Sequence, residues 1–190
     1  VVELADGYIQ ARAPKGLNGG RVVFPMVSVG ATENALMAAA LAKGSSELLN
    51  AAREPEIVDL ADCLNAMGAK ITGHGTDTIR IEGVDGLHGA THSVMSDRIE
   101  AGTFAIAAAM TNGDLTLHNT EGRNLDALLM VLRETGATIT ESDNAIRVVA
   151  NGRPLATDIT TDPFPGFPTD LQAQFMAMMC IAEGYSRISE

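Results

Sequence analysis

The feature that most constrains the fold is an internal repeat of about 70 residues. A helical, alanine- or methionine-rich segment, a glycine and a short strand-like segment recur in this order at residues 38–48, 107–115 and 178–186. The three glycines, Gly44, Gly113 and Gly184, are spaced by 69 and 71 residues. A glycine after a helical segment is typical of a left-handed residue that ends the helix. Repetition at a fixed period predicts that one supersecondary unit occurs several times along the chain.

A second landmark repeats with the first. The segments 68–72 and 136–140 both read Gly-Ala-x-Ile-Thr, and each follows a segment with apolar residues at three- and four-residue steps. That spacing indicates an amphipathic helix, and the alternating residues that follow, up to about residues 81 and 148, indicate hairpins. Each unit therefore reads strand, helix, strand, helix, hairpin, which predicts an α/β fold.

The repeat also predicts where each unit begins. We expect leading strands at residues 21–24, 91–94 and 157–160. Residues 8–12 have the pattern of a closing strand from an earlier unit, and the sequence ends at residues 188–190, after the second strand of a third unit. We therefore expect the chain to be an internal fragment of a longer protein.

Composition excludes several classes of protein. Hydrophobic residues make up 46% of the chain and aromatic residues 4%, so an aliphatic core is expected, while the net charge of −11 argues against general nucleic-acid binding. No apolar run reaches the roughly 18 residues of a membrane span, and we expect a cytoplasmic protein with no membrane partner. The two cysteines, Cys63 and Cys180, lie among apolar residues and are expected to be buried thiols. With no metal-ligand spacing among cysteines and histidines, we expect neither a metal nor a cofactor.

Polar residues gather where the predicted helices begin. Ser28 and Gly30 precede the first helix, Asp97-Arg98 the helix of the second unit, and Thr169-Asp170 that of the third. Unpaired N–H groups and the helix dipole suit a phosphate at such an end, and equivalent ends of packed repeats would converge on one polar cleft. Taken singly, each has a structural alternative: helix capping for Ser28 and for Thr169-Asp170, and an exposed ion pair for Asp97-Arg98.

The loop at residues 51–56 is the other polar segment of interest. Glu54 and Glu56 flank Pro55 immediately before a predicted helix. Proline at the first helical position and an acidic residue in the first turn are common at helix starts, so a purely structural role is the alternative here.

Four motifs together resemble the enolpyruvyl transferase family, in particular UDP-N-acetylglucosamine 1-carboxyvinyltransferase. These are Val-Ser-Val-Gly-Ala-Thr-Glu-Asn at 27–34, Asn-Ala-Ala-Arg-Glu-Pro-Glu-Ile-Val-Asp at 50–59, Asp-Arg-Ile-Glu-Ala-Gly-Thr-Phe at 97–104 and Phe-Pro-Thr-Asp-Leu-Gln-Ala-Gln-Phe at 167–175. The resemblance implies two domains, each an inside-out α/β barrel of three repeats. Residues 1–95 would then form the C-terminal part of the first domain and residues 96–190 the N-terminal part of the second.

The resemblance also implies transfer of an enolpyruvyl group from phosphoenolpyruvate to the 3-hydroxyl of UDP-N-acetylglucosamine, the committed step of peptidoglycan synthesis. Asp170 would contact the sugar hydroxyl as general base, and a charged network would include Glu54, Glu56 and Arg98. The complete protein is expected to be a monomer, while an isolated fragment is expected to be prone to self-association. Donors to the diphosphate would be Val27, Ser28, Val29 and Gly30.

The sequence departs from the family pattern in ways that affect activity. Met26 stands where the family often has lysine, which removes one cation from the expected diphosphate site. The family's N-terminal Lys-Asn pair, the mobile loop with its proton-donating Cys or Asp, and the later arginines that bind phosphoenolpyruvate have no counterpart here, so we expect the isolated chain to be inactive. Two alternatives remain: 5-enolpyruvylshikimate-3-phosphate synthase, for which a Ser-Ser-Gln motif is expected, and a non-catalytic repeat module that binds a partner through its sheet faces.

Overall fold

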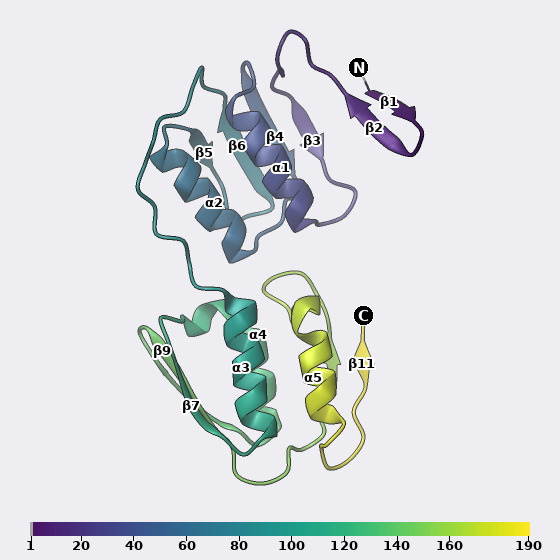
Figure 1. Cartoon of the computed structure of the whole chain (residues 1–190), viewed down its shortest axis with the longest axis vertical. Helices are drawn as coiled ribbons and strands as arrows, with labels where there is room; N and C mark the ends of the chain where they lie inside the picture. The colour runs from purple at the N-terminus through teal and green to yellow at the C-terminus, as the bar shows by residue number, and fades with distance from the viewer. Residues whose placement is uncertain (1) are drawn as a thin grey trace. The chain divides into compact units, whose positions relative to one another are not determined.

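The structure is a computed structural model that describes residues 2–190 of the chain. Two compact units are present, unit 1 up to Ser93 and unit 2 from Val94 onward (Figure 1), and each is described by itself. No helix in the described residues combines the length and apolar character needed to cross a membrane.

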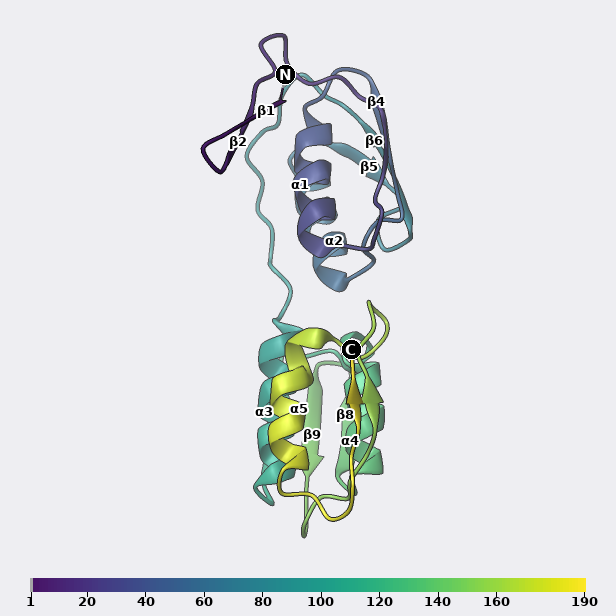
Figure 2. The same ribbon diagram turned by 90° about the vertical axis from the view of Figure 1, so that its right-hand side faces the viewer.

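Unit 1 is a four-stranded sheet with two helices on one face (Figures 1 and 2). The strand order is β3-β4-β6-β5, in which β3 and β4 are parallel and the other pairs antiparallel. Leu36 on α1, Ile57 on α2 and Ile79 on β6 are fully buried between the layers. A separate hairpin of β1 and β2 pairs only with itself. The elements are β1 (Val2–Ala5), β2 (Tyr8–Ala11), β3 (Arg21–Val23), α1 (Val29–Ala40), β4 (Ser45–Leu49), α2 (Pro55–Ala66), β5 (Lys70–Thr72) and β6 (Thr78–Glu82).

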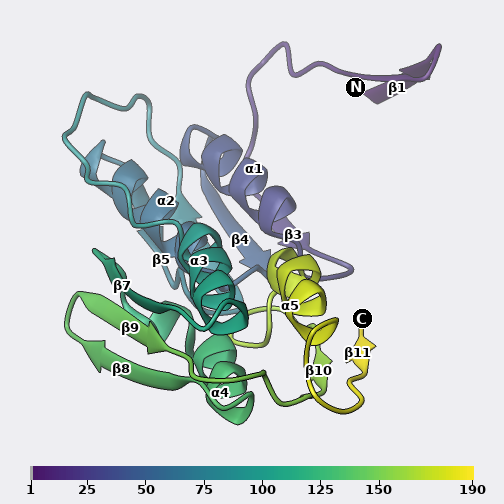
Figure 3. The same ribbon diagram turned by 60° about the horizontal axis from the view of Figure 1, so that its bottom comes forward.

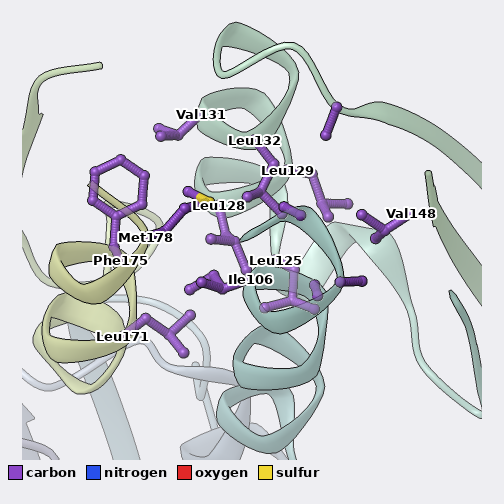
Figure 4. Close-up of a cluster of buried hydrophobic side chains, with 14 of the residues drawn as sticks. Ile106, Leu125, Leu128, Leu129, Val131, Leu132, Val148, Leu171, Phe175 and Met178 are labelled. Carbon is purple, nitrogen blue, oxygen red and sulfur yellow. The ribbon is translucent and has the colours of Figure 1, made fainter. Parts of the chain in front are cut away.

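Unit 2 repeats this plan with a three-stranded antiparallel sheet in the order β7-β9-β8 and a short parallel pair, β10-β11. Helices α3 and α4 cover the sheet, and α5 packs against α3 (Figure 3). Leu128 and Leu129 of α4 and Phe175 of α5 meet in its core (Figure 4). The elements are α3 (Arg98–Met110), β7 (Asp114–His118), the 3-10 helix η1 (Gly122–Asn124), α4 (Asp126–Glu134), β8 (Thr138–Ser142), β9 (Ala145–Val149), β10 (Ile159–Thr160), the 3-10 helix η2 (Thr169–Leu171), α5 (Gln172–Met179) and β11 (Ile188–Ser189).

The repeat predicted from sequence is confirmed by the matching order of elements. The segment β4-α2-β5-β6 of unit 1 has the same order as β7-α4-β8-β9 of unit 2. Both predicted hairpins form, with Ile71 opposite Ile81 in the first and Ile139 opposite Val148 in the second. The fold class is therefore α/β, as expected, with sheets that do not close on themselves.

Two of the expected leading strands differ from the prediction. Residues 91–94 form no strand and pair with no strand of either sheet. His92 instead contacts Asp59 of α2, with 3.0 Å between Nε2 and Oδ1. The third leading strand is shorter than expected and consists only of Ile159 and Thr160.

The three repeat glycines do not end the helices in the way that was predicted. Gly44 and Gly184 have positive φ angles of 87° and 113°, but they lie in the turns before the next strand rather than immediately after the helix. In the second repeat, Asn112 takes the left-handed conformation instead, with φ of 56°. A side chain at Gly113 would lie 3.2 Å from the backbone of Ala108, so close approach explains this glycine.

The prediction of two buried thiols is also wrong in part. Cys63 of α2 is half-buried, but Cys180 is exposed. Helix α5 ends at Met179, so Cys180 lies beyond its last helical residue and outside the face that Phe175 and Met178 bury.

Candidate functional site

The turn from β3 into α1 carries the predicted diphosphate donors. Ser28 is the N-cap of α1, with its Oγ accepting a hydrogen bond from the Ala31 N–H at 3.3 Å, which confirms the predicted helix start. Among residues 2–190, neither the Val29 nor the Gly30 N–H has a hydrogen-bond acceptor. Two backbone donors and a hydroxyl therefore lie together at one helix end, where the dipole favours an anion.

Gly30 leaves open space above this end of the helix. The residue is exposed, its φ is not positive, and a Cβ built on it would meet no atom within 4 Å. Neither the backbone conformation nor the packing of the chain therefore requires a glycine here. The open space leaves room for a ligand against the first turn.

The next loop of unit 1 carries the predicted carboxylates. Pro55 is the first residue of α2 and Glu56 lies in its first turn, as expected for a helix start. Glu54, however, is only 7% exposed and its side chain makes no capping hydrogen bond. Burying a carboxylate is costly unless polar or charged groups compensate, so helix capping alone does not account for Glu54.

Two residues that the sequence analysis did not single out connect these loops. The Thr32 side chain, fully buried, contacts both Ser28 and Ala52 through hydrogen bonds of 2.8 and 3.0 Å. The Asn50 side chain donates to the Phe24 carbonyl at 3.0 Å. The only sequence signal for either residue is its position within a motif, because burial and long-range contacts are not visible in local sequence.

In unit 2, Asp97 and Arg98 have distinct roles. Asp97 caps α3, with Oδ1 accepting hydrogen bonds from the N–H groups of Ile99 at 2.8 Å and Glu100 at 3.0 Å. Arg98 is only 7% exposed, and its guanidinium carbon lies 5.8 Å from the centroid of the Phe164 ring. The alternative of an exposed ion pair is therefore wrong, because Arg98 is held inside the unit next to an aromatic face.

Asp170 lies in the 3-10 turn that leads into α5. The capping alternative is wrong for this residue, since the N-cap positions of η2 and α5 are Pro168 and Leu171 and neither helix has a side-chain cap. The Asp170 side chain is exposed, and within the described part of the chain no hydrogen bond or ion pair engages its carboxylate. Its oxygens are accessible to a substrate.

Packing places the helix starts that carry Arg98 and Asp170 next to each other. A Cβ on Gly102 of α3 would lie 2.6 Å from Leu171 Cδ1, so α3 and η2 approach closely. One turn further on, the Gln174 side-chain amide donates to Thr103 Oγ1 at 3.0 Å. The predicted site residues thus fall into two groups, with Val27–Gly30, Glu54 and Glu56 in unit 1 and Arg98 and Asp170 in unit 2.

Metal-binding groups and cavities are the other features of the described chain that could mark a site. Between Val2 and Glu190, no group of three or more histidine, cysteine, aspartate or glutamate side chains could hold a metal ion. A cavity of about 740 Å³ is lined by β3, β4, β5 and β6 and by Asn65, but it includes none of the predicted site residues.

Parallel strands joined by helices, repeated hairpins and polar helix starts together define an α/β fold built from repeats. The model of the family described as EPSP synthase (3-phosphoshikimate 1-carboxyvinyltransferase) matches residues 2–190, and the chain belongs to this family. It is 60% identical over 193 residues to UDP-N-acetylglucosamine 1-carboxyvinyltransferase of Sinorhizobium fredii, and 54% identical over 189 residues to that of Gluconacetobacter diazotrophicus. These alignments cover 100% of this chain but only 44% and 45% of those proteins.

Solved structures show the same fold. The enolpyruvyl transferase NikO from Streptomyces tendae matches with a TM-score of 0.81 at 20% identity, over 100% of this chain and 48% of that one. EPSP synthase from Acinetobacter baumannii matches with a TM-score of 0.59 at 22% identity, over 91% of this chain and 41% of that one. At such identities the likeness establishes the enolpyruvyl transferase fold alone.

Proposed function

We propose that this chain is part of an enolpyruvyl transferase that moves the enolpyruvyl group of phosphoenolpyruvate to the 3-hydroxyl of UDP-N-acetylglucosamine. The observation that carries the proposal is identity of 54–60% along the whole chain to proteins named for this reaction. The solved EPSP synthase is only 22% identical, and Ser28-Val29-Gly30 differs from the Ser-Ser-Gln motif expected for that enzyme. We also propose that the enzyme acts in the cytoplasm as a monomer in peptidoglycan synthesis.

The diphosphate of the nucleotide sugar would bind at the start of α1. Val27, Ser28, Val29 and Gly30 would contact it through backbone N–H groups and the serine hydroxyl. The free N–H groups of Val29 and Gly30 and the open space at Gly30 support this placement. Met26 is 71% exposed beside the turn and supplies no charge, so backbone donors and the helix dipole would carry more of the binding.

Asp170 would accept the proton of the sugar 3-hydroxyl as that oxygen adds to the central carbon of phosphoenolpyruvate and the methylene carbon gains a proton. Inorganic phosphate would then leave as the resulting methyl group loses a proton, which restores the carbon–carbon double bond of the enolpyruvyl group. Its accessible carboxylate and its place beside the α3 start support this role. Arg98 would supply positive charge near the attacking and leaving groups, with Glu54 and Glu56 in the same charged network. The proton needed at the methylene carbon of the donor would come from a segment outside residues 1–190, so the isolated chain would be inactive.

The test is phosphate release from phosphoenolpyruvate by the complete protein that contains this chain. We expect release to require UDP-N-acetylglucosamine and not to occur with shikimate 3-phosphate. Asp170→Asn should lower kcat by about a hundredfold or more, because general-base catalysis typically contributes that much. Asp143→Asn, at an exposed aspartate in the β8–β9 turn, is the matched control and should leave the rate unchanged. Full activity in Asp170→Asn would contradict the assigned role, and turnover of shikimate 3-phosphate would contradict the substrate.

A further inference from the structure

We propose that Thr32 and Asn50 are positioning residues that clamp residues 24–28, the turn that leads into the proposed diphosphate donors, against the loop that begins at Asn50. The inference rests on the proposed function and extends it to residues that need not touch the ligand. Two independent contacts carry it, one at each end of the turn.

The first contact is the Thr32 hydroxyl, which bridges the two loops. Thr32 is fully buried, and its Oγ1 donates to the Ser28 carbonyl at 2.8 Å while accepting from the Ala52 N–H at 3.0 Å. Ala52 is also fully buried, so removing the hydroxyl would leave its N–H without an acceptor.

This bridge acts directly on a proposed ligand donor. The Ser28 carbonyl and the Val29 N–H belong to one planar trans peptide and point in opposite directions. Because the Ser28 carbonyl is held pointing toward Thr32, the Val29 N–H is held pointing away from it, at the N-terminal end of α1. The Thr32 backbone N–H strengthens this by donating to the same carbonyl at 3.0 Å.

The second contact is the Asn50 side chain, which holds the beginning of the turn. Its Nδ2 donates to the Phe24 carbonyl at 3.0 Å, next to the backbone pairing of the Phe24 N–H with the Leu49 carbonyl. Asn50 has φ of 56°, a left-handed conformation that asparagine and glycine adopt more readily than other residues. The turn is thus tied at both ends to the segment that leads to Glu54.

A fixed turn matters because prepositioned donors do not have to be ordered when the ligand binds. Loss of either clamp contact should therefore weaken binding of the nucleotide sugar more than it slows the chemical step. A residue that served stability alone would lower the melting temperature without changing the affinity of the folded protein.

The experiment compares four variants of the complete protein by calorimetric titration with UDP-N-acetylglucosamine, steady-state kinetics and thermal unfolding. Thr32→Val keeps the branched shape of the side chain and removes the hydroxyl, whereas Thr32→Ser keeps the hydroxyl. Asn50→Gly keeps the left-handed backbone and removes the side chain. Asn119→Gly makes the same change after β7, at φ of 57°, and is the matched control.

We expect Thr32→Val and Asn50→Gly each to raise the Kd and KM for the nucleotide sugar by about threefold to tenfold, the worth of one hydrogen bond. Their kcat should stay within about twofold, and Thr32→Ser and Asn119→Gly should bind like the wild type. Unchanged affinity in both folded test variants, or equal weakening in Asn119→Gly, would overturn the clamp. A wild-type protein that does not bind the nucleotide sugar would overturn the proposed function, and the clamp with it.

Discussion

Gly30 and Gly102 are both helical glycines, yet their surroundings differ completely. A Cβ on Gly30 would meet nothing within 4 Å, whereas one on Gly102 would lie 2.6 Å from Leu171 Cδ1 and 3.0 Å from Leu128 Cδ2. Both leucines are fully buried and have little room to move. Packing within the chain therefore explains why residue 102 is glycine. At residue 30 the chain leaves the space empty, so we attribute that glycine to the proposed ligand.

Alanine at these two positions should have opposite effects on stability. Gly30→Ala should keep or raise the free energy of unfolding, by up to about 1 kcal/mol, because alanine favours helix. It should also weaken nucleotide-sugar binding by at least about tenfold, since its methyl group would occupy the proposed site. Gly102→Ala should destabilise unit 2 by about 1–3 kcal/mol through overpacking. Urea denaturation and calorimetric titration measure both effects, and unchanged affinity in Gly30→Ala would argue against a ligand at this turn.

Local chemistry was enough to predict some residues of the candidate site but not others. The Ser28 cap and Pro55 at the first position of α2 follow from short-range preferences and are confirmed. The burial of Glu54 and Arg98 could not be predicted, because it depends on distant segments, such as the one that brings Phe164 beside Arg98. Thr32 was missed for the same reason, since its partner Ala52 belongs to another loop.

At the scale of elements, an ion pair across the sheet of unit 2 joins β7 to β9. Arg147 donates through Nε to Asp114 Oδ1 at 2.8 Å and through Nη2 to Oδ2 at 2.6 Å. These hydrogen bonds, with the positive charge of Arg147, hold the pKa of Asp114 below its ordinary value of 3.8. Both side chains are about half exposed, so solvent screens the pair and its contribution is modest.

This pair should give unit 2 a pH-dependent stability that Asp114→Asn removes. A carboxyl whose pKa is lowered in the folded state stabilises it fully above the unfolded value, near 3.8, and the stabilisation disappears as pH falls through the lower, folded-state pKa. The melting temperature of the wild type should therefore exceed that of Asp114→Asn at neutral pH, and the gap should close below pH 3.8. The melting temperature of the control Asp143→Asn should stay close to that of the wild type at every pH. A difference that stays constant from pH 7 to pH 2 would contradict this assignment.

The elements themselves were predicted where they rest on local periodicity. Both hairpins and the helices before them have clear patterns and form as expected. Residues 91–94 were expected to be a strand from their place in the repeat, but they form none. A strand also needs a sheet edge to pair with, and the sequence of the segment does not show whether one is present. The exposed Cys180 reflects a similar limit, since its burial depended on where α5 ends.

At the scale of the whole molecule, the chain has two separate hydrophobic cores. One is built from residues of α1, β4, α2, β5 and β6 in unit 1, and the other from residues of α3, α4, β9 and α5 in unit 2. The assignment of residues 1–95 and 96–190 to successive domains of the complete enzyme remains a prediction. The chain spans about 45% of the length of the relatives that it matches, so each core is expected to gain contacts in the complete protein.

Separate cores predict that a cavity in one unit destabilises that unit alone. Leu36 of α1 and Leu129 of α4 are both fully buried, so Leu36→Ala and Leu129→Ala form a matched pair, each expected to cost about 2–5 kcal/mol. Hydrogen exchange read by mass spectrometry should show faster exchange in residues 94–190 for Leu129→Ala and in residues 2–93 for Leu36→Ala. Faster exchange in both units with either variant would mean that they unfold as one cooperative body. We expect the loss of protection from exchange to stay within one unit. Local unfolding spreads through shared buried contacts, and each leucine belongs to only one of the two cores.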